Sequence, residues 1–126
     1  MKLDTFMSIV AVFAFVFGLS YIVAPVQANL PFGITLDGTA QWVCRYLGAA
    51  YLGIAVLVWF ARKATEGKAL HAILLGGFIM SAIGIVLAVL DSLYGEGNAL
   101  VWSFVAVYVF LTLGFGYFRF IKRPGA

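Results

Sequence analysis

The chain has 126 residues, of which 64% are hydrophobic and 10% are charged, and its formal net charge at pH 7 is +3. A soluble domain is about half apolar and a quarter charged, so this composition excludes an ordinary water-soluble fold, and the length allows one domain at most. The basic residues are few and fall in separate segments, which argues against nucleic-acid binding. The composition therefore indicates an integral membrane protein, in which apolar side chains face lipid.

Four long apolar stretches predict four membrane-spanning helices. About 20 helical residues cross a hydrocarbon core about 30 Å thick, and a lone strand would leave its backbone groups unpaired in lipid. We predict an all-α, antiparallel, up-down four-helix bundle that forms one transmembrane domain over residues 1–126. The expected helices cover residues 3–24, 41–62, 69–91 and 98–120.

The first stretch also resembles a secretory signal peptide, because Lys2 precedes it and Val26-Gln27-Ala28 follows it. The apolar region of a signal peptide is typically about 7–15 residues long, whereas this stretch is longer and begins beside Asp4. We therefore expect a retained helix.

The connection between the first two helices, residues 25–40, is the long one of the chain. Pro25 and Pro31 discourage helix there, and Gly33 and Gly38 favour turns. Loops of this length in compact bundles are often functional. Two interpretations stay open: a lid over the outer mouth of the bundle, or a flexible extracytoplasmic connection.

Arg45 is the charged residue that the second helix must include to reach spanning length. Helical rise puts it about 9 Å on the outer side of the helix midpoint, which lies near Tyr51. An ionisable residue inside a membrane helix marks a candidate functional site, and Asp37 and Asp91 are the candidate partners of Arg45. The competing interpretation is that Arg45 snorkels to the outer interface or forms a structural ion pair.

Hydroxyl groups form a second candidate feature near the middle of the membrane. Tyr51, Ser81 and Tyr108 fall at similar depth on three helices, where they either bond to one another as packing contacts or line a small ligand cavity. With the charged residues and a neighbouring tryptophan, they make up the predicted ligand site: Arg45, Tyr51, Asp91, Trp42, Ser81 and Tyr108.

The distribution of charges predicts the orientation in the membrane. If the helices alternate, the basic residues other than Arg45 share one side: Lys2, Arg62, Lys63, Lys68, Arg119, Lys122 and Arg123. The opposite side holds Asp37, Asp91 and Glu96. The positive-inside rule then places both termini in the cytoplasm. Aromatic residues are expected at the outer interface (Tyr21, Trp42, Tyr94 and Trp102) and at the inner one (Trp59, Tyr117 and Phe118).

Small residues four positions apart recur inside the helices and predict close approach of helix backbones. The pairs are Ala14 and Gly18, Cys44 and Gly48, Ala49 and Gly53, Gly77 and Ser81, and Gly84 and Ala88. They fit contacts within one chain as well as contacts between chains.

Residues for catalysis or cofactor binding are scarce. His71 is the single histidine and Cys44 the single cysteine, so the sequence supplies no haem ligand pair, no metal cluster and no dithiol. No nucleophile with a base and an orienting group can be assembled. We therefore predict no catalytic residues, no cofactor and no metal, and an enzyme is the least expected class of function.

The segment Arg45-Tyr46-Leu47-Gly48-Ala49-Ala50-Tyr51-Leu52-Gly53, with Trp59-Phe60-Ala61-Arg62 after it, resembles the second helix of small bacterial four-helix membrane proteins of the DoxX-like kind. Pro25 after the first helix and the long loop that follows are also similar. The resemblance implies a compact four-helix bundle and carries over no catalytic residue.

These features favour a multi-pass protein of the bacterial cytoplasmic (inner) membrane that contacts the lipid bilayer. Our leading hypothesis is that it binds a lipid or an apolar small molecule in an outer-facing cavity near Arg45. The alternative is an accessory or scaffold subunit of a membrane complex or homo-oligomer. A channel or transporter is less expected, because it requires a more polar pore.

Overall fold

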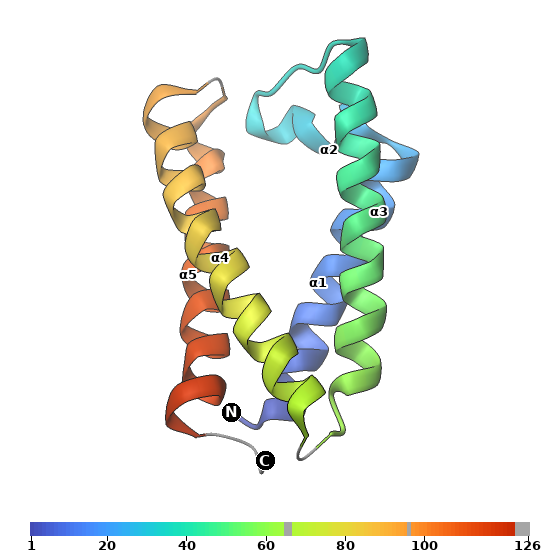
Figure 1. The fold of residues 1–126 in the computed structure, drawn as a ribbon. Helices are drawn as coiled ribbons and strands as arrows, with labels where there is room; N and C mark the ends of the chain where they lie inside the picture. Colours follow the sequence, from blue (N-terminus) through green and yellow to red (C-terminus); the bar gives the residue numbers. More distant parts are fainter. Residues whose placement is uncertain (65–66, 96, 123–126) are drawn as a thin grey trace. The chain divides into compact units, whose positions relative to one another are not determined.

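The computed structural model describes residues 1–64, 67–95 and 97–122. Its α-helices are α1 (Leu3–Val23), α2 (Pro25–Asn29), α3 (Gly38–Ala61), α4 (Lys68–Tyr94) and α5 (Trp102–Gly116) (Figure 1). Short 3-10 helices cover Leu30–Phe32 and Ala99–Val101, and a π-helical turn over Tyr117–Ile121 continues α5. No strand occurs within these ranges, so the all-α prediction is confirmed. Glu96 and Arg123, used above to predict the orientation, lie outside the described residues.

Four helical segments of the described chain are long and apolar enough to cross a membrane: Leu3–Val23, Gly38–Ala61, Lys68–Tyr94 and Ala99–Ile121. Many of their large apolar side chains are exposed on the surface of the chain, among them Phe15, Phe60 and Leu113. Water would make such a surface unstable, whereas the hydrocarbon of a bilayer accommodates it. The chain is therefore a small multi-pass membrane protein, as predicted.

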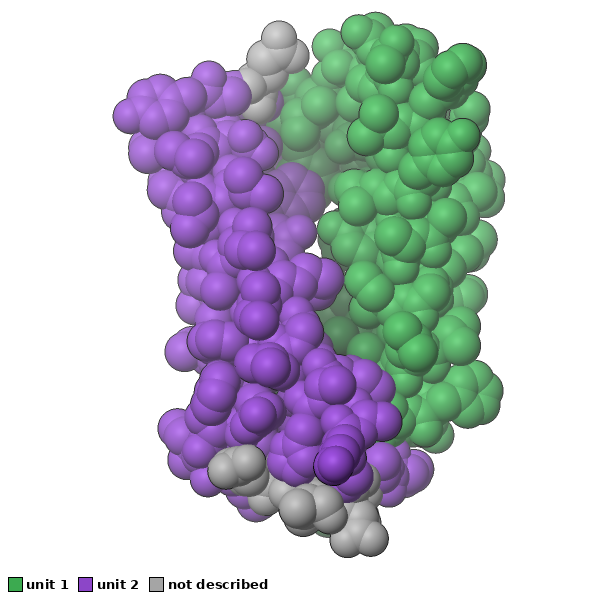
Figure 2. Space-filling view, viewed as in Figure 1, with its two compact units in different colours: residues 1–62 green, residues 63–126 purple. Residues whose placement is uncertain are grey.

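The chain divides into two compact units, residues 1–62 and residues 63–126, which Figure 2 shows in green and purple. The first unit contains α1, α2 and α3, and the second contains α4 and α5.

The first unit is an antiparallel hairpin of α1 and α3 that packs through two glycines. A Cβ atom added to Gly18 would lie 2.8 Å from the carbonyl oxygen of Gly48, and one added to Gly48 would lie 2.7 Å from that of Gly18. At the other end of the hairpin, Arg62 lies beside Asp4. The helices therefore run in opposite directions and meet at backbone distance, as the small-residue pattern predicts.

The second unit is an antiparallel hairpin of α4 and α5 in which aromatic rings lie on glycines. A Cβ atom on Gly77 would come within 2.6 Å of the Phe115 ring, and one on Gly84 would overlap the Tyr108 ring. The prediction that Phe118 faces the inner membrane interface is wrong. Phe118 is buried, because its ring packs inside the chain instead of against lipid.

The predicted loop over residues 25–40 is wrong in part, because it contains α2, a 3-10 turn and the first turn of α3. Pro25 occupies the first turn of α2, where the missing N–H has no intrahelical partner to lose, so proline starts this helix instead of preventing it. The side chain of Asn29, which is buried, donates to the carbonyl oxygen of Pro25 at 2.8 Å and contacts Cys44 Sγ at 3.8 Å. The segment is thus fastened to α3.

The start of α3 at Gly38 also differs from the predicted start at residue 41. Asp37 caps this helix, because its Oδ1 accepts a hydrogen bond of 2.8 Å from the backbone N–H of Ala40. Aspartate is a strongly preferred N-cap residue. Asp37 was a candidate partner for Arg45, but its carboxylate accepts a hydrogen bond from the backbone of α3 instead.

Candidate functional site

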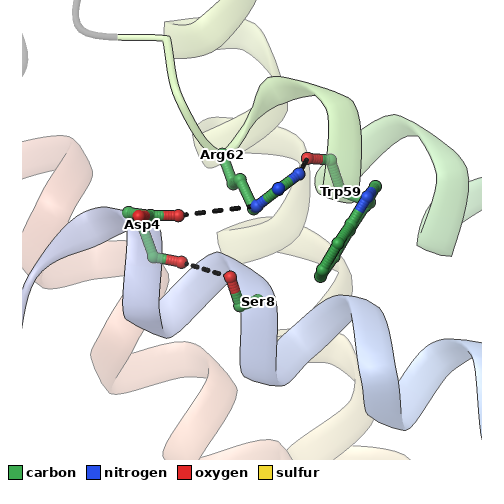
Figure 3. A network of polar contacts seen from close by, with 4 residues as sticks. All are labelled: Asp4, Ser8, Trp59 and Arg62. Carbon is green, nitrogen blue, oxygen red and sulfur yellow. Dashed lines mark hydrogen bonds and ion pairs between the residues drawn. The ribbon is translucent and has the colours of Figure 1, made fainter.

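A cluster of polar contacts joins the ends of α1 and α3 in the first unit (Figure 3). Arg62 follows the last residue of α3, where helix carbonyl groups lack intrahelical partners and attract a cation. Its Nη1 donates to the carbonyl oxygen of Trp59 at 2.6 Å, and its guanidinium carbon lies 3.7 Å from the centroid of the Trp59 ring. The cation therefore lies over the face of the tryptophan ring.

Asp4 approaches Arg62 from the first turn of α1. Its Oδ1 lies 3.6 Å from Arg62 Nε, and Ser8 Oγ donates to the backbone carbonyl oxygen of Asp4 at 2.8 Å. The two charged side chains are 41% and 23% exposed, and an ion pair of that kind contributes about 0–1 kcal/mol to stability. Its main effect is to orient the guanidinium. The Nη2 group of Arg62 makes no hydrogen bond to another described residue.

An apolar groove of about 290 Å³ lies between α1 and α3, and Trp59 is one of the residues that line it. Its floor consists of the buried residues Ala11 and Ala55, whose small side chains leave the space open. The walls are larger and partly exposed side chains: Val12, Phe15, Val56, Trp59 and Phe60. Trp59 thus both lines the groove and makes the cation–π contact with Arg62.

This arrangement offers complementary surfaces for an amphipathic molecule. The groove fits a hydrocarbon chain, and Arg62 can present planar N–H donors to an anionic oxygen pair beyond the end of that chain. Trp59 has the ring type that prefers the membrane interface, which is the depth at which a lipid head meets its acyl chains.

Arg45 and its neighbours lie elsewhere on α3. Arg45 is exposed and forms no hydrogen bond or ion pair with another residue of the first unit, and Trp42 is exposed one turn before it. Tyr51 is half-buried, and its ring centroid lies 6.1 Å from that of Tyr21 on α1. Tyr51 therefore belongs to the packing between α1 and α3.

The other predicted site residues belong to the second unit. Ser81 is fully buried, and its hydroxyl donates to backbone oxygens of its own helix, Gly77 at 2.7 Å and Phe78 at 3.2 Å. The Tyr108 ring lies over Gly84, and Asp91 is exposed near the end of α4. The structure thus brings Ser81 and Tyr108 into one helix pair, while Arg45, Trp42 and Tyr51 share the first unit.

The Asp4, Trp59 and Arg62 cluster was not predicted as a site. One signal was present in the sequence: Trp59 and Arg62 are three residues apart, so a helix puts them on the same face. The pairing with Asp4 depends on which residues of α1 and α3 lie opposite each other.

Side chains that could bind a metal ion are spread over the described residues. Within residues 1–64, 67–95 and 97–122, no three His, Cys, Asp or Glu side chains are grouped so that they could hold a metal ion. Cys44 is buried with a free thiol.

No protein-family model, no curated protein and no solved structure matches the chain. Its function is therefore inferred from the geometry of the first unit.

Proposed function

We propose that this small membrane protein binds a phospholipid, with one acyl chain in the groove between α1 and α3 and the phosphate group beside Arg62. The observation that supports this most strongly is the double role of Trp59, which lines the groove and stacks against the Arg62 guanidinium at 3.7 Å. The apolar groove suits the hydrocarbon chain of an anionic amphiphile, and the Arg62 cation suits its charged head.

The apolar groove alone would give little selectivity. An acyl chain in a bilayer is already surrounded by hydrocarbon, so it gains only van der Waals packing when it enters the groove. Selectivity must come from the head, where a guanidinium in a partly desolvated position binds phosphate oxygens with charge-assisted hydrogen bonds. The ligand class is that of our sequence-based hypothesis, but the α3 residues of the groove begin at Ala55, about 15 Å along the helix from Arg45 by helical rise over 10 residues.

Filling the groove should release the lipid. Val56 lines the groove and is 56% exposed, so Val56→Trp adds a ring to the groove without displacing a core residue. Val43 is 61% exposed on the same helix and does not line the groove, which makes Val43→Trp a matched control. We expect native mass spectrometry to show about tenfold weaker phospholipid binding for Val56→Trp and unchanged binding for Val43→Trp.

Equal binding by both tryptophan variants and the unmodified chain would overturn the proposal. Circular dichroism establishes in parallel that both variants keep their helix content.

Orientation, location and family membership complete the proposal. We infer that both termini face the cytoplasm of a bacterium and that the membrane is the inner one, because the basic residues other than Arg45 share one side if the four helices alternate in direction. We also propose that the chain is related to DoxX-like proteins, because residues 45–53 resemble the second helix of that family.

A role as a scaffold subunit or homo-oligomer is favoured by one observation. Ala49 and Gly53 are both exposed on α3, and a Cβ atom on Gly53 would meet nothing within 4 Å. The other small-residue pairs contribute buried residues to the hairpins. Pairs of this kind let helices of different chains approach closely.

This second candidate predicts that Ala49→Leu lowers the oligomeric state in mild detergent, since a larger side chain would block close helix contact. Ala106→Leu, at an exposed position of α5, is the control. A monomeric unmodified chain in native mass spectrometry would refute self-association.

A further inference from the structure

Arg45 differs from Arg62 in that no acidic side chain of the first unit pairs with it. The side chain is exposed on α3 and makes no hydrogen bond or ion pair with another residue of the first unit. The nearest acidic residue in sequence is Asp37, and its carboxylate caps α3 through Ala40. Arg45 therefore presents all five of its N–H donors to whatever surrounds the helix.

The packing of the first unit fixes the level of Arg45 along the hairpin. Gly18 of α1 lies opposite Gly48 of α3, and the helices are antiparallel. Tyr21, three residues after Gly18, therefore lies level with Arg45, three residues before Gly48. Arg45 and Arg62 are 17 residues apart on α3, which corresponds to about 25 Å of helix. This separation is shorter than a hydrocarbon core of about 30 Å, so the two guanidinium groups approach the head-group regions of opposite leaflets.

Two amphipathic aromatic residues flank Arg45. Trp42 precedes it by one helical turn, and Tyr46 is the next residue; both are exposed on the surface of the chain. Tryptophan and tyrosine prefer the membrane interface, where their rings contact acyl chains and their polar groups contact lipid heads. The surroundings of Arg45 on α3 therefore favour contact with a lipid head group.

We propose that Arg45 binds the phosphate of a second phospholipid, in the leaflet opposite to the one at Arg62, and draws that head group toward the bilayer centre. An arginine in hydrocarbon is costly, and the cost is relieved when it snorkels to phosphate or when the leaflet thins locally around it. α3 contains no acidic residue, the Asp37 carboxylate before it accepts from Ala40, and Asp4 pairs with Arg62. The first unit therefore gives Arg45 no counter-ion, and a phosphate diester supplies one. This site is separate from the groove and stands without it.

The test is a lipid titration of delipidated protein in detergent, read by native mass spectrometry. The probes are a phosphatidylglycerol and a diacylglycerol with the same acyl chains, which lacks the phosphate. We expect two tight phosphatidylglycerol adducts and only weak diacylglycerol binding. Arg45→Gln should weaken one of these adducts about tenfold, and Arg45→Lys should weaken it less, because the ammonium keeps the charge but loses the planar pair of donors.

Control variants separate this site from the groove and from net charge. Lys122→Gln changes the net charge by the same amount at the end of the π-helical turn and should leave both adducts in place. Val56→Trp should remove the other adduct, and the double variant should lose both. If Arg45→Gln loses one phosphatidylglycerol adduct and Val56→Trp loses none, lipid binding in the groove is refuted and lipid binding at Arg45 is supported.

Two results would overturn the inference. The first is unchanged phosphatidylglycerol binding by Arg45→Gln, and the second is diacylglycerol binding as tight as that of phosphatidylglycerol. Since Arg45 packs against no described residue through a polar contact, its variants should keep the helix content of the unmodified chain, which circular dichroism measures.

Discussion

Gly48→Ala is expected to destabilise the chain by about 3 kcal/mol, whereas Gly53→Ala five residues later should be neutral or slightly stabilising. A Cβ atom on Gly48 would lie 2.7 Å from the carbonyl oxygen of Gly18, which is backbone and cannot rotate away. The hairpin must therefore open to relieve the contact. At Gly53 a Cβ atom meets nothing within 4 Å, so alanine brings only its better helix propensity.

The two variants make the same substitution in one helix, and only Gly48→Ala should lower stability. The measurement is unfolding by sodium dodecyl sulfate in mixed micelles, followed by circular dichroism. If Gly48→Ala unfolds together with the unmodified chain, α1 and α3 do not meet at these two glycines.

Gly77→Ala is the second substitution with a large expected effect, a loss of about 2 kcal/mol from the hairpin of α4 and α5. The added Cβ atom would lie 2.6 Å from the Phe115 ring, and that ring is only 2% exposed, so it has little room to move. The preceding residue, Gly76, has open space where its Cβ atom would be. Gly76→Ala is therefore the neighbouring control, and we expect it to be harmless.

A second substitution tests the cause. If the Phe115 ring is responsible, Gly77→Ala should cost less in a Phe115→Leu background than in the unmodified chain, and the difference measures the coupling between the two positions. Equal costs in the two backgrounds would show that another contact limits the space at Gly77.

The four spanning helices were predictable because lipid makes charged residues costly, so the charges mark the helix ends. The predicted helix over residues 3–24 and α1 (Leu3–Val23) agree closely for this reason. The prolines misled the prediction for residues 25–40. Proline disrupts a helix interior but suits a first turn, and only the path of the chain after Val23 decides which of these positions Pro25 takes.

The site was harder to predict than the fold. Arg45 attracted attention because a charge inside a span is visible in the sequence, whereas Arg62 looked like one of several interfacial basic residues. The groove and the contact between Asp4 and Arg62 depend on the antiparallel register of α1 and α3. That register is set by the close approach of Gly18 and Gly48, and a list of small-residue pairs does not show which pairs face each other.

The most direct test of lipid binding in the first unit is photolabelling with a phospholipid that carries a diazirine in one acyl chain. Mass spectrometry of the labelled peptides then identifies the residues that contact the chain. We predict that label concentrates on the groove residues Val12, Phe15, Val56 and Phe60 and falls when Val56 is replaced by Trp. Label spread evenly over exposed apolar residues such as Val43 and Val86, with no preference for the groove, would contradict the account.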